Sequence, residues 1–158
     1  MSAASDSSQL PLLIGVGGFL GAGKTTAIIR AAERLLASGR RVAIVTNDQA
    51  SGLVDTAAAW EALGGDRASV SEIAGGCFCC RFDDLTNTLQ RTADLVHPDV
   101  ILAEAVGSCT DLAATVYQPL AQLQLAPVRL GPLTVVVDAV RLRSLLLAGE
   151  LPGLPRTV

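Results

Sequence analysis

Short apolar runs alternate with longer segments of helical periodicity along most of the chain. Strands are predicted at residues 10–16, 41–46, 70–73, 100–103 and 133–137, and helices at residues 25–38, 56–63, 83–96, 111–123 and 141–148. This alternation predicts a three-layer α/β domain with a mainly parallel sheet. In such sheets ligands bind at the carboxyl ends of the strands, so we expect function in the loops that follow the strands.

Capping and breaking residues mark the ends of several predicted elements. Gly39 follows the first helix as its expected C-cap, and Asp111 precedes the fourth helix as its expected N-cap. Pro119 is expected to kink or end that fourth helix. The polar segment 47–55 after the second strand is predicted to be a loop. Three leucines of the third helix are expected to face the core, namely Leu85, Leu89 and Leu95.

The segment between the first strand and the first helix fits the phosphate-binding pattern G-x-x-x-x-G-K-[ST] without a mismatch. Its lysine, Lys24, is the only one in a chain with eleven arginines. This choice indicates a position where a compact ammonium must reach the β- and γ-phosphates of a nucleotide. The glycines let backbone N–H groups converge on phosphate oxygens, and Thr25 is expected to hold Mg²⁺. The sequence therefore predicts nucleotide binding.

Three of the four cysteines lie within one Gly-Cys-Phe-Cys-Cys turn. Thiols this close can bind one soft metal ion such as Zn²⁺. Cys77, Cys79 and Cys80 then leave a fourth position for water or for a partner protein's ligand. Two other interpretations remain open, a redox pair and a group of small buried hydrophobic residues. Cys109 and His97 are further candidate ligands, but for His97, which directly precedes a proline, an ordinary solvated histidine is favoured.

Acidic residues follow three of the predicted strands. Glu104 is suited to hold Mg²⁺ through water or to orient an attacking water, and Gly107 lets the backbone approach the terminal phosphate. The alternative for Glu104 is a surface glutamate at a strand end. Asp48 is a candidate for the Mg²⁺ shell or for a mobile switch. Asp138 is either functional or an ordinary helix cap.

Composition and charge narrow the class of protein. A length of 158 residues predicts one domain at 10–148, with a disordered leader at 1–9 and an irregular tail at 149–158. Aromatic residues make up only 3%, so the core must be aliphatic. The net charge of −3 and the lack of a basic run argue against nucleic-acid binding. Short apolar stretches and a polar N-terminus predict no transmembrane helix and no secretory signal, and hence a cytoplasmic location.

Together these residues resemble the CobW/HypB/UreG family of P-loop GTPases, and its CobW-like branch in particular. The similarity rests on the phosphate loop at 18–26, the Gly-Cys-Phe-Cys-Cys turn at 76–80 and Glu-x-x-Gly at 104–107. The strand Val-Val-Val-Asp-Ala at 135–139 is also similar. The cysteine turn is the discriminating motif, because phosphate loops occur in many families. The resemblance covers residues 10–148.

The resemblance implies GTP hydrolysis coupled to handling of Zn²⁺, Co²⁺ or another thiophilic ion, as in metallochaperones, insertases and cobalamin pathways. It also implies a client metalloprotein as partner. By motif, the nucleotide-binding residues would be Gly18, Gly21, Ala22, Gly23, Lys24, Thr25, Thr26 and Gly107. The catalytic residues would be Lys24, Glu104 and Asp48, the Mg²⁺ ligands Thr25 and Asp48, and the cargo ligands Cys77, Cys79 and Cys80. Nucleotide and metal would favour one ordered state of loops 47–55 and 75–81, which hydrolysis would loosen.

The chain departs from the family pattern in two places. Asn-Asp-Gln at 47–49 replaces the Asn-Glu-Phe-Gly expected of CobW-like members. No lysine follows Lys24, so the guanine-reading Asn/Thr-Lys-x-Asp motif is missing and a preference for GTP over ATP does not follow from the sequence. The chain also ends about where the next helix and strand of such a GTPase should begin. A missing strand would leave an apolar sheet edge that favours a homodimer.

Three functions are compatible with these features. The leading one is a metal-linked GTPase that is weak in this truncated form. The second is a nucleotide- and metal-binding module without useful turnover, completed by a partner or by a C-terminal part. The third, an ATP-dependent P-loop kinase, is disfavoured by the cysteine turn.

Overall fold

The computed structural model describes residues 10–48, 61, 70–109, 111–123 and 125–148. Several sequence predictions fall outside these residues: the leader at 1–9, the tail at 149–158, the predicted loop beyond Asp48 and, apart from Glu61, the helix at 56–63.

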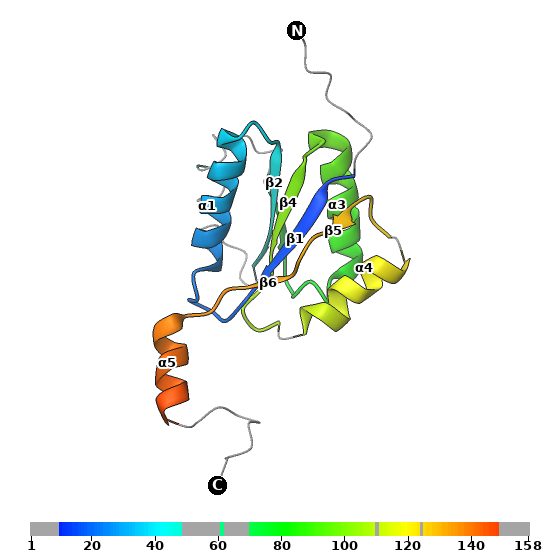
Figure 1. The fold of residues 1–158 in the computed structure, drawn as a ribbon. Helices are drawn as coiled ribbons and strands as arrows, with labels where there is room; N and C mark the ends of the chain where they lie inside the picture. The colour runs from blue at the N-terminus through cyan, green and yellow to red at the C-terminus, as the bar shows by residue number, and fades with distance from the viewer. Residues whose placement is uncertain (1–9, 49–60, 62–69, 110, 124, 149–158) are drawn as a thin grey trace.

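A parallel sheet forms the centre of the domain (Figure 1). Its strands are β1 (Leu12–Gly17), β2 (Val42–Asp48), β3 (Val70–Ala74), β4 (Val100–Glu104), β5 (Arg129–Leu130) and β6 (Thr134–Val135). The order is β3-β2-β4-β1-β5. Strand β6 also pairs with β1, at Val16 and Gly17, whereas β5 pairs with β1 at Leu12 and Leu13. All of these pairings are parallel. The carboxyl ends of the strands therefore lie along one edge, at the lower end of the sheet in Figure 1.

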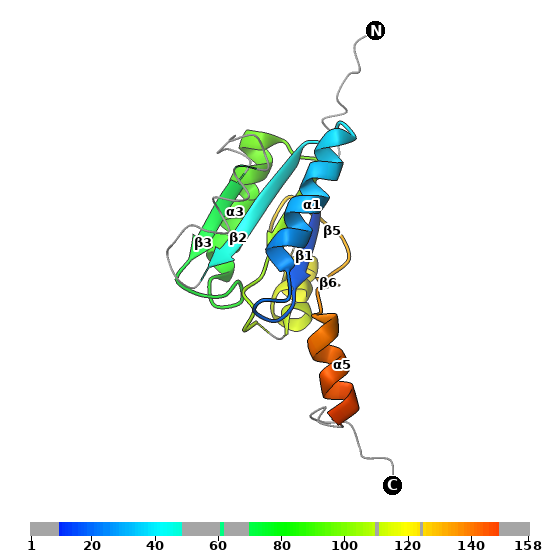
Figure 2. The same ribbon diagram turned by 90° about the vertical axis from the view of Figure 1, so that its left-hand side faces the viewer.

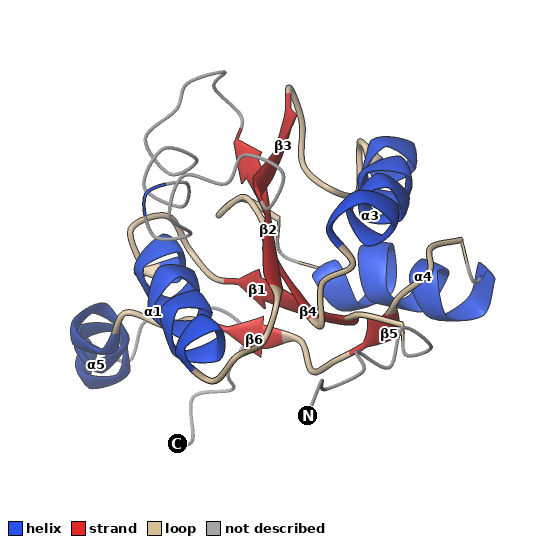
Figure 3. Ribbon diagram, turned by 90° about the horizontal axis from the view of Figure 1, so that it is seen from above, coloured by secondary structure: helices blue, strands red, loops and turns tan. Residues whose placement is uncertain are grey.

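Helices cover both faces of this sheet (Figure 3). One face carries α1 (Lys24–Ala37), and the other carries α3 (Phe82–Val96) and α4 (Gln118–Leu123). A π-helical turn, η2 (Ala113–Tyr117), leads directly into α4. The final helix, α5 (Ala139–Ala148), extends past the carboxyl edge of the sheet rather than packing on it (Figure 2). These layers confirm the predicted α/β fold with a mainly parallel sheet.

Each face of the sheet has an aliphatic core of its own. Under α1, the fully buried side chains of Ile28 and Ala32 pack against residues of β2 and β4 such as Ile44 and Leu102. Under α3 and α4, Leu85 and Leu89 pack against the opposite face of the same strands. Because both faces are covered, the first four residues of β2 and of β4 are all apolar, which is typical of a buried parallel sheet.

Capping residues behave largely as the sequence predicts. Gly39 has a φ of 81° just past α1, and its N–H bonds the carbonyl of Leu36 at 2.9 Å. A side-chain oxygen of Asp111 accepts a hydrogen bond from the N–H of Ala114 at 3.0 Å. Pro119 does not end the helix, because α4 continues to Leu123. Instead the helix changes from the π to the α register immediately before Pro119, where a missing N–H matters least.

Three sequence predictions were wrong in detail. Strand β2 extends through Asn47 and Asp48, which were assigned to a loop, because they pair with β3 in register. The strand predicted at 133–137 is only two residues long, as β6, and the sequence did not predict β5. Both short strands form by pairing with β1. Leu95 is 77% exposed; it lies in the last turn of α3, about 70° from the centre of the buried stripe at 3.6 residues per turn.

The two leucines of α3 provide a matched test of the core. Leu89→Ala should lower the free energy of unfolding by about 2–5 kcal/mol, because it empties a fully buried site. Leu95→Ala makes the same chemical change on the same helix at an exposed position and should alter it by no more than about 0.5 kcal/mol. Urea denaturation followed by circular dichroism measures both. Equal losses in the two variants would contradict the orientation of α3.

Candidate functional site

The loops singled out by the sequence meet at the carboxyl edge of the sheet. The phosphate loop follows β1, the cysteine turn follows β3, and the segment 105–109 follows β4. The register pairs Val16 with Glu104, so the ends of β1 and β4 lie level with one another. Among the described helices none is long and apolar enough to cross a membrane.

Glycines give the phosphate loop its shape. Gly18, Gly21 and Gly23 have φ values of 134°, 76° and 92°, a region that residues with a side chain rarely adopt. A Cβ on Gly18 would also lie 2.2 Å from the carbonyl oxygen of Val136. Between these glycines the N–H of Ala22 donates to the carbonyl of Phe19 at 3.2 Å. The loop thus closes on itself directly before α1, whose N-terminus supplies the positive end of a helix dipole.

Lys24 is buried within this loop rather than extended into solvent. It is 7% exposed, and its Nζ donates to the carbonyl oxygen of Phe19 at 3.2 Å. A buried ammonium is costly unless it meets an acceptor or an anion, so the loop holds this cation against its own backbone. Thr26 follows on the first turn of α1 with its side chain exposed.

A hydrogen bond joins the start of α1 to the end of β4. The hydroxyl of Thr25 donates to Oε1 of Glu104 at 2.8 Å. Glu104 is only 6% exposed, so it is not the surface glutamate of the alternative interpretation. The two side chains present oxygen atoms to each other next to the phosphate loop, and oxygen is the ligand type that Mg²⁺ prefers. Asp48 is placed by its backbone at the end of β2, the strand next to β4.

Gly107 brings the segment 105–109 against the phosphate loop. A Cβ built on Gly107 would lie 2.6 Å from the backbone nitrogen of Leu20. A tight turn holds this segment, since the N–H of Cys109 donates to the carbonyl of Val106 at 3.0 Å. Only glycine allows so close an approach of the two backbones.

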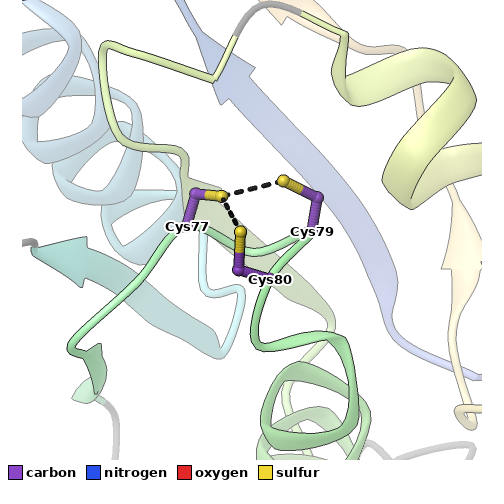
Figure 4. A group of neighbouring side chains, drawn as sticks. All are labelled: Cys77, Cys79 and Cys80. Atoms are coloured by element: carbon purple, nitrogen blue, oxygen red, sulfur yellow. Dashed lines mark hydrogen bonds between the residues drawn. The ribbon is translucent and has the colours of Figure 1, made fainter.

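The cysteine turn gathers its thiols at one point (Figure 4). The Sγ atom of Cys77 lies 2.8 Å from that of Cys79 and 3.1 Å from that of Cys80. All three sulfur atoms fall within 4.8 Å of one another. Phe78, between them in sequence, is 3% exposed and packs into the core, where it anchors the turn. A grouping of this kind suits a single thiophilic ion.

The thiols differ in how readily they ionise. Hydrogen bonding from the Cys79 thiol is the main cause that lowers the pKa of Cys77 to about 7. The bond with Cys77 in turn raises the pKa of Cys80 to about 11. Burial raises the pKa of Cys109 to about 12. The first thiolate of the group is therefore expected on Cys77.

Sequence reasoning missed one residue that positions the cysteine turn. Asn47, at the end of β2 and 7% exposed, donates through Nδ2 to the carbonyl of Ile73 at 2.9 Å and to that of Gly76 at 2.6 Å. It ties the start of the turn to the strand beside β4. The only sequence signal for this role is an asparagine directly after an apolar run. Its meaning depends on knowing that β2 includes Asn47, which the structure shows.

Two other candidates lie away from the site chemistry. His97 is exposed and lies at the C-terminal end of α3, whereas the cysteine turn precedes the N-terminal end of that helix. This position agrees with the interpretation of His97 as a solvated histidine. Asp138 accepts hydrogen bonds from the N–H groups of Val140 and Arg141 at 2.9 and 3.1 Å, which makes it a cap of α5.

Solved structures similar to the chain include two FtsY proteins. The chain is similar to the signal recognition particle receptor FtsY from Elizabethkingia anophelis in complex with GDP, at 18% identity and a TM-score of 0.49, covering 80% of this chain and 41% of that one. It is also similar to cell division protein ftsY from Thermotoga maritima, at 21% identity and a TM-score of 0.49, covering 90% of this chain and 49% of that one. The chain thus spans less than half the length of either protein.

A comparison with curated protein sequences gave no match. The sequence model described as "CobW/HypB/UreG, nucleotide-binding domain" matches residues 12–150, which is most of the chain. The match takes in the phosphate loop, the cysteine turn and the segment that follows β4, the three features that meet at the carboxyl edge. The chain therefore belongs to the CobW/HypB/UreG family and carries the nucleotide-binding domain of that family.

Proposed function

We propose that this chain binds and hydrolyses GTP with Mg²⁺, and that it couples this reaction to the binding and delivery of a thiophilic metal ion such as Zn²⁺ or Co²⁺. One observation carries the proposal: the phosphate loop and the three clustered thiols lie at the same edge of the sheet, and the segment after β4 contacts both, at Leu20 and at Cys79. Membership of the CobW/HypB/UreG family supports the nucleotide half.

In the nucleotide half, the backbone N–H groups of the phosphate loop and the ammonium of Lys24 hold the phosphates. The oxygen donors of Thr25 and Glu104 fit a Mg²⁺ ion, with Asp48 as a further carboxylate. When bound, Mg²⁺ would neutralise charge that develops on the phosphate oxygens. Glu104 orients the attacking water, and the N–H of Gly107 contacts the terminal phosphate.

In the metal half, Cys77, Cys79 and Cys80 bind the cargo ion as thiolates and release their protons on binding. Three thiolates leave one coordination position open, from which a client metalloprotein can take the ion. The two halves communicate through Asn47, which bonds the turn carbonyl of Gly76 and precedes Asp48 in β2. An ordered end of β2 would favour the binding of both the nucleotide and the cargo ion.

A binding module without useful turnover is the second candidate function. The specific observation in its favour is that no lysine follows Lys24, so the motif that reads guanine in this family is missing. Binding would then depend on the phosphates, and a partner or further chain would complete the site.

Lys24 provides the test of the nucleotide site. Lys24→Ala should weaken the binding of Mg·GTP by about 10- to 150-fold, because a hydrogen bond to a charged group contributes about 1.5–3 kcal/mol. Arg30→Ala, which removes an exposed cation from the same helix, is the matched control and should bind normally. Calorimetric titration measures both. Unchanged affinity in Lys24→Ala would remove the basis of the nucleotide site, and equal affinity of the wild-type chain for Mg·ATP would favour the binding module.

The clustered thiols provide the test of the metal site and of its coupling. Replacing Cys77, Cys79 and Cys80 together by serine should abolish binding of one Zn²⁺ per chain and remove any effect of Zn²⁺ on GTP hydrolysis. His97→Ala, which deletes a good zinc ligand outside the cluster, should change neither quantity. Zinc stoichiometry by chelator competition and phosphate release report the two effects. Zinc binding that survives in the triple variant would place the cargo site elsewhere.

Cys77 should react with iodoacetamide at a lower pH than an ordinary thiol. Its pKa is lowered to about 7, so the alkylation rate should be half-maximal near pH 7 and fall as the pH drops below that value. Cys80 on the same turn, with a pKa raised to about 11, is the internal control and should remain slow at pH 7. Mass spectrometry of the labelled peptides resolves the two. A half-maximal pH near 9 for Cys77 would contradict the hydrogen-bonded cluster.

A further inference from the structure

A fourth thiol lies beside the cluster on a different loop. The Sγ atom of Cys109 is 3.7 Å from that of Cys79, although the two residues are 30 positions apart. Four sulfur atoms placed 2.3 Å from a tetrahedral zinc ion are separated from each other by about 3.8 Å. The distance between Cys79 and Cys109 thus suits two thiolates that share one ion.

We propose that Cys109 is a fourth, nucleotide-controlled ligand of the cargo ion, so that the site alternates between four thiolates and three. This inference rests on the proposed function and deepens it, because it names the group that closes the open coordination position. The three cysteines of the turn come from the segment after β3, and Cys109 comes from the segment after β4. A bound ion would therefore bridge two loops.

The segment that carries Cys109 is in direct contact with the phosphate loop. Gly107, two residues earlier, packs so tightly on Leu20 that a Cβ would lie 2.6 Å from its backbone nitrogen. A single turn connects Val106 to Cys109 through a 3.0 Å hydrogen bond. A cleft of about 290 Å³ is lined by Gly18 and Phe19 of the phosphate loop and also by Gly107 and Cys109. A displacement of Gly107 must therefore move Cys109.

A small rearrangement separates the present arrangement from a four-thiolate site. Cys77, Cys79 and Cys80 are mutually within 4.8 Å, whereas Cys109 joins the group through Cys79. The gaps of 2.8 and 3.1 Å within the turn are shorter than the tetrahedral spacing of about 3.8 Å. An ion would push these sulfur atoms apart and draw in the fourth. Packing of Cys109 as a small apolar residue is the competing explanation, and it predicts no change in ligand number.

The change between four and three thiolate ligands follows from the contacts that hold the segment 105–109. With a triphosphate bound, the N–H of Gly107 contacts the terminal phosphate and keeps Cys109 on the ion, which gives a closed four-thiolate site. After hydrolysis and loss of that contact, the bond between the metal and the Cys109 sulfur breaks, and the sulfur takes a proton from solvent. Three thiolates and one open position remain, at which a ligand atom of the client forms a new bond to the ion.

The test counts sulfur ligands in the reduced, full-length chain. Co²⁺ and Zn²⁺ are loaded with a non-hydrolysable GTP analogue or with GDP, and X-ray absorption measures the coordination. The wild-type chain should show four sulfur ligands with the analogue, and Cys109→Ser should show three. Zinc affinity should differ between the two nucleotide states by about 5- to 150-fold in the wild-type chain and not at all in Cys109→Ser. Cys109→His, which restores a ligand atom, should recover the difference, whereas Cys109→Ala should not.

Two results would overturn the inference while leaving the proposed function in place. One is a wild-type site with three sulfur ligands in both nucleotide states. The other is a Cys109→Ser variant that keeps the wild-type ratio of zinc affinities. A wild-type chain that binds neither ion would instead defeat the proposed metal function, and this inference with it. Circular dichroism of each variant identifies loss of fold as a cause.

Discussion

The parallel pairing of β1 with β4 is the constraint on which the site depends. Its register places Val16 opposite Glu104, and the N–H of Ala105 continues the ladder to the carbonyl of Val16 at 2.9 Å. Glu104 therefore leaves the sheet where the phosphate loop begins, within 2.8 Å of the Thr25 hydroxyl. A slip of one residue would turn Glu104 to the opposite face, which β-sheet geometry makes costly because both faces are buried. The aliphatic cores on the two faces hold this register and thereby keep Glu104 beside Thr25.

The same sheet determines where the thiols lie. Pairing of β3 with β2, and of β2 with β4, puts the cysteine turn at the edge already occupied by the phosphate loop. Phe78 anchors the turn in the core, and Asn47 holds the carbonyl of Gly76. Both residues act on the metal site without contacting an ion, because each restricts the conformation of the cysteine turn. These two contacts hold the thiols together through the chain's own packing, so less ordering remains to oppose ion binding.

How much the sequence could predict depended on whether a feature is local. The phosphate loop, the cysteine turn and the alternation of strands and helices are local patterns, and the fold and the family followed from them. The extent of β2 through Asn47, the recruitment of β5 and β6 by β1, and the contact between Cys79 and Cys109 are pairings across long sequence separations. Periodicity carries no information on such pairings. Leu95 shows the remaining limit, since a hydrophobic residue close to the helical stripe is not necessarily on it.

Two polar side chains of the phosphate loop already have partners within the chain, and this bears on how a nucleotide would act. The ammonium of Lys24 bonds the carbonyl of Phe19, and the hydroxyl of Thr25 bonds Glu104. Phosphate and Mg²⁺ would compete with these two partners, so binding at these positions exchanges one contact for another. Releasing Glu104 from Thr25 alters the contacts at the end of β4, directly before the segment that carries Gly107 and Cys109. Since a ligand shifts an equilibrium only through contacts that differ between two states, this exchange is the physical step from which coupling between nucleotide and metal can arise.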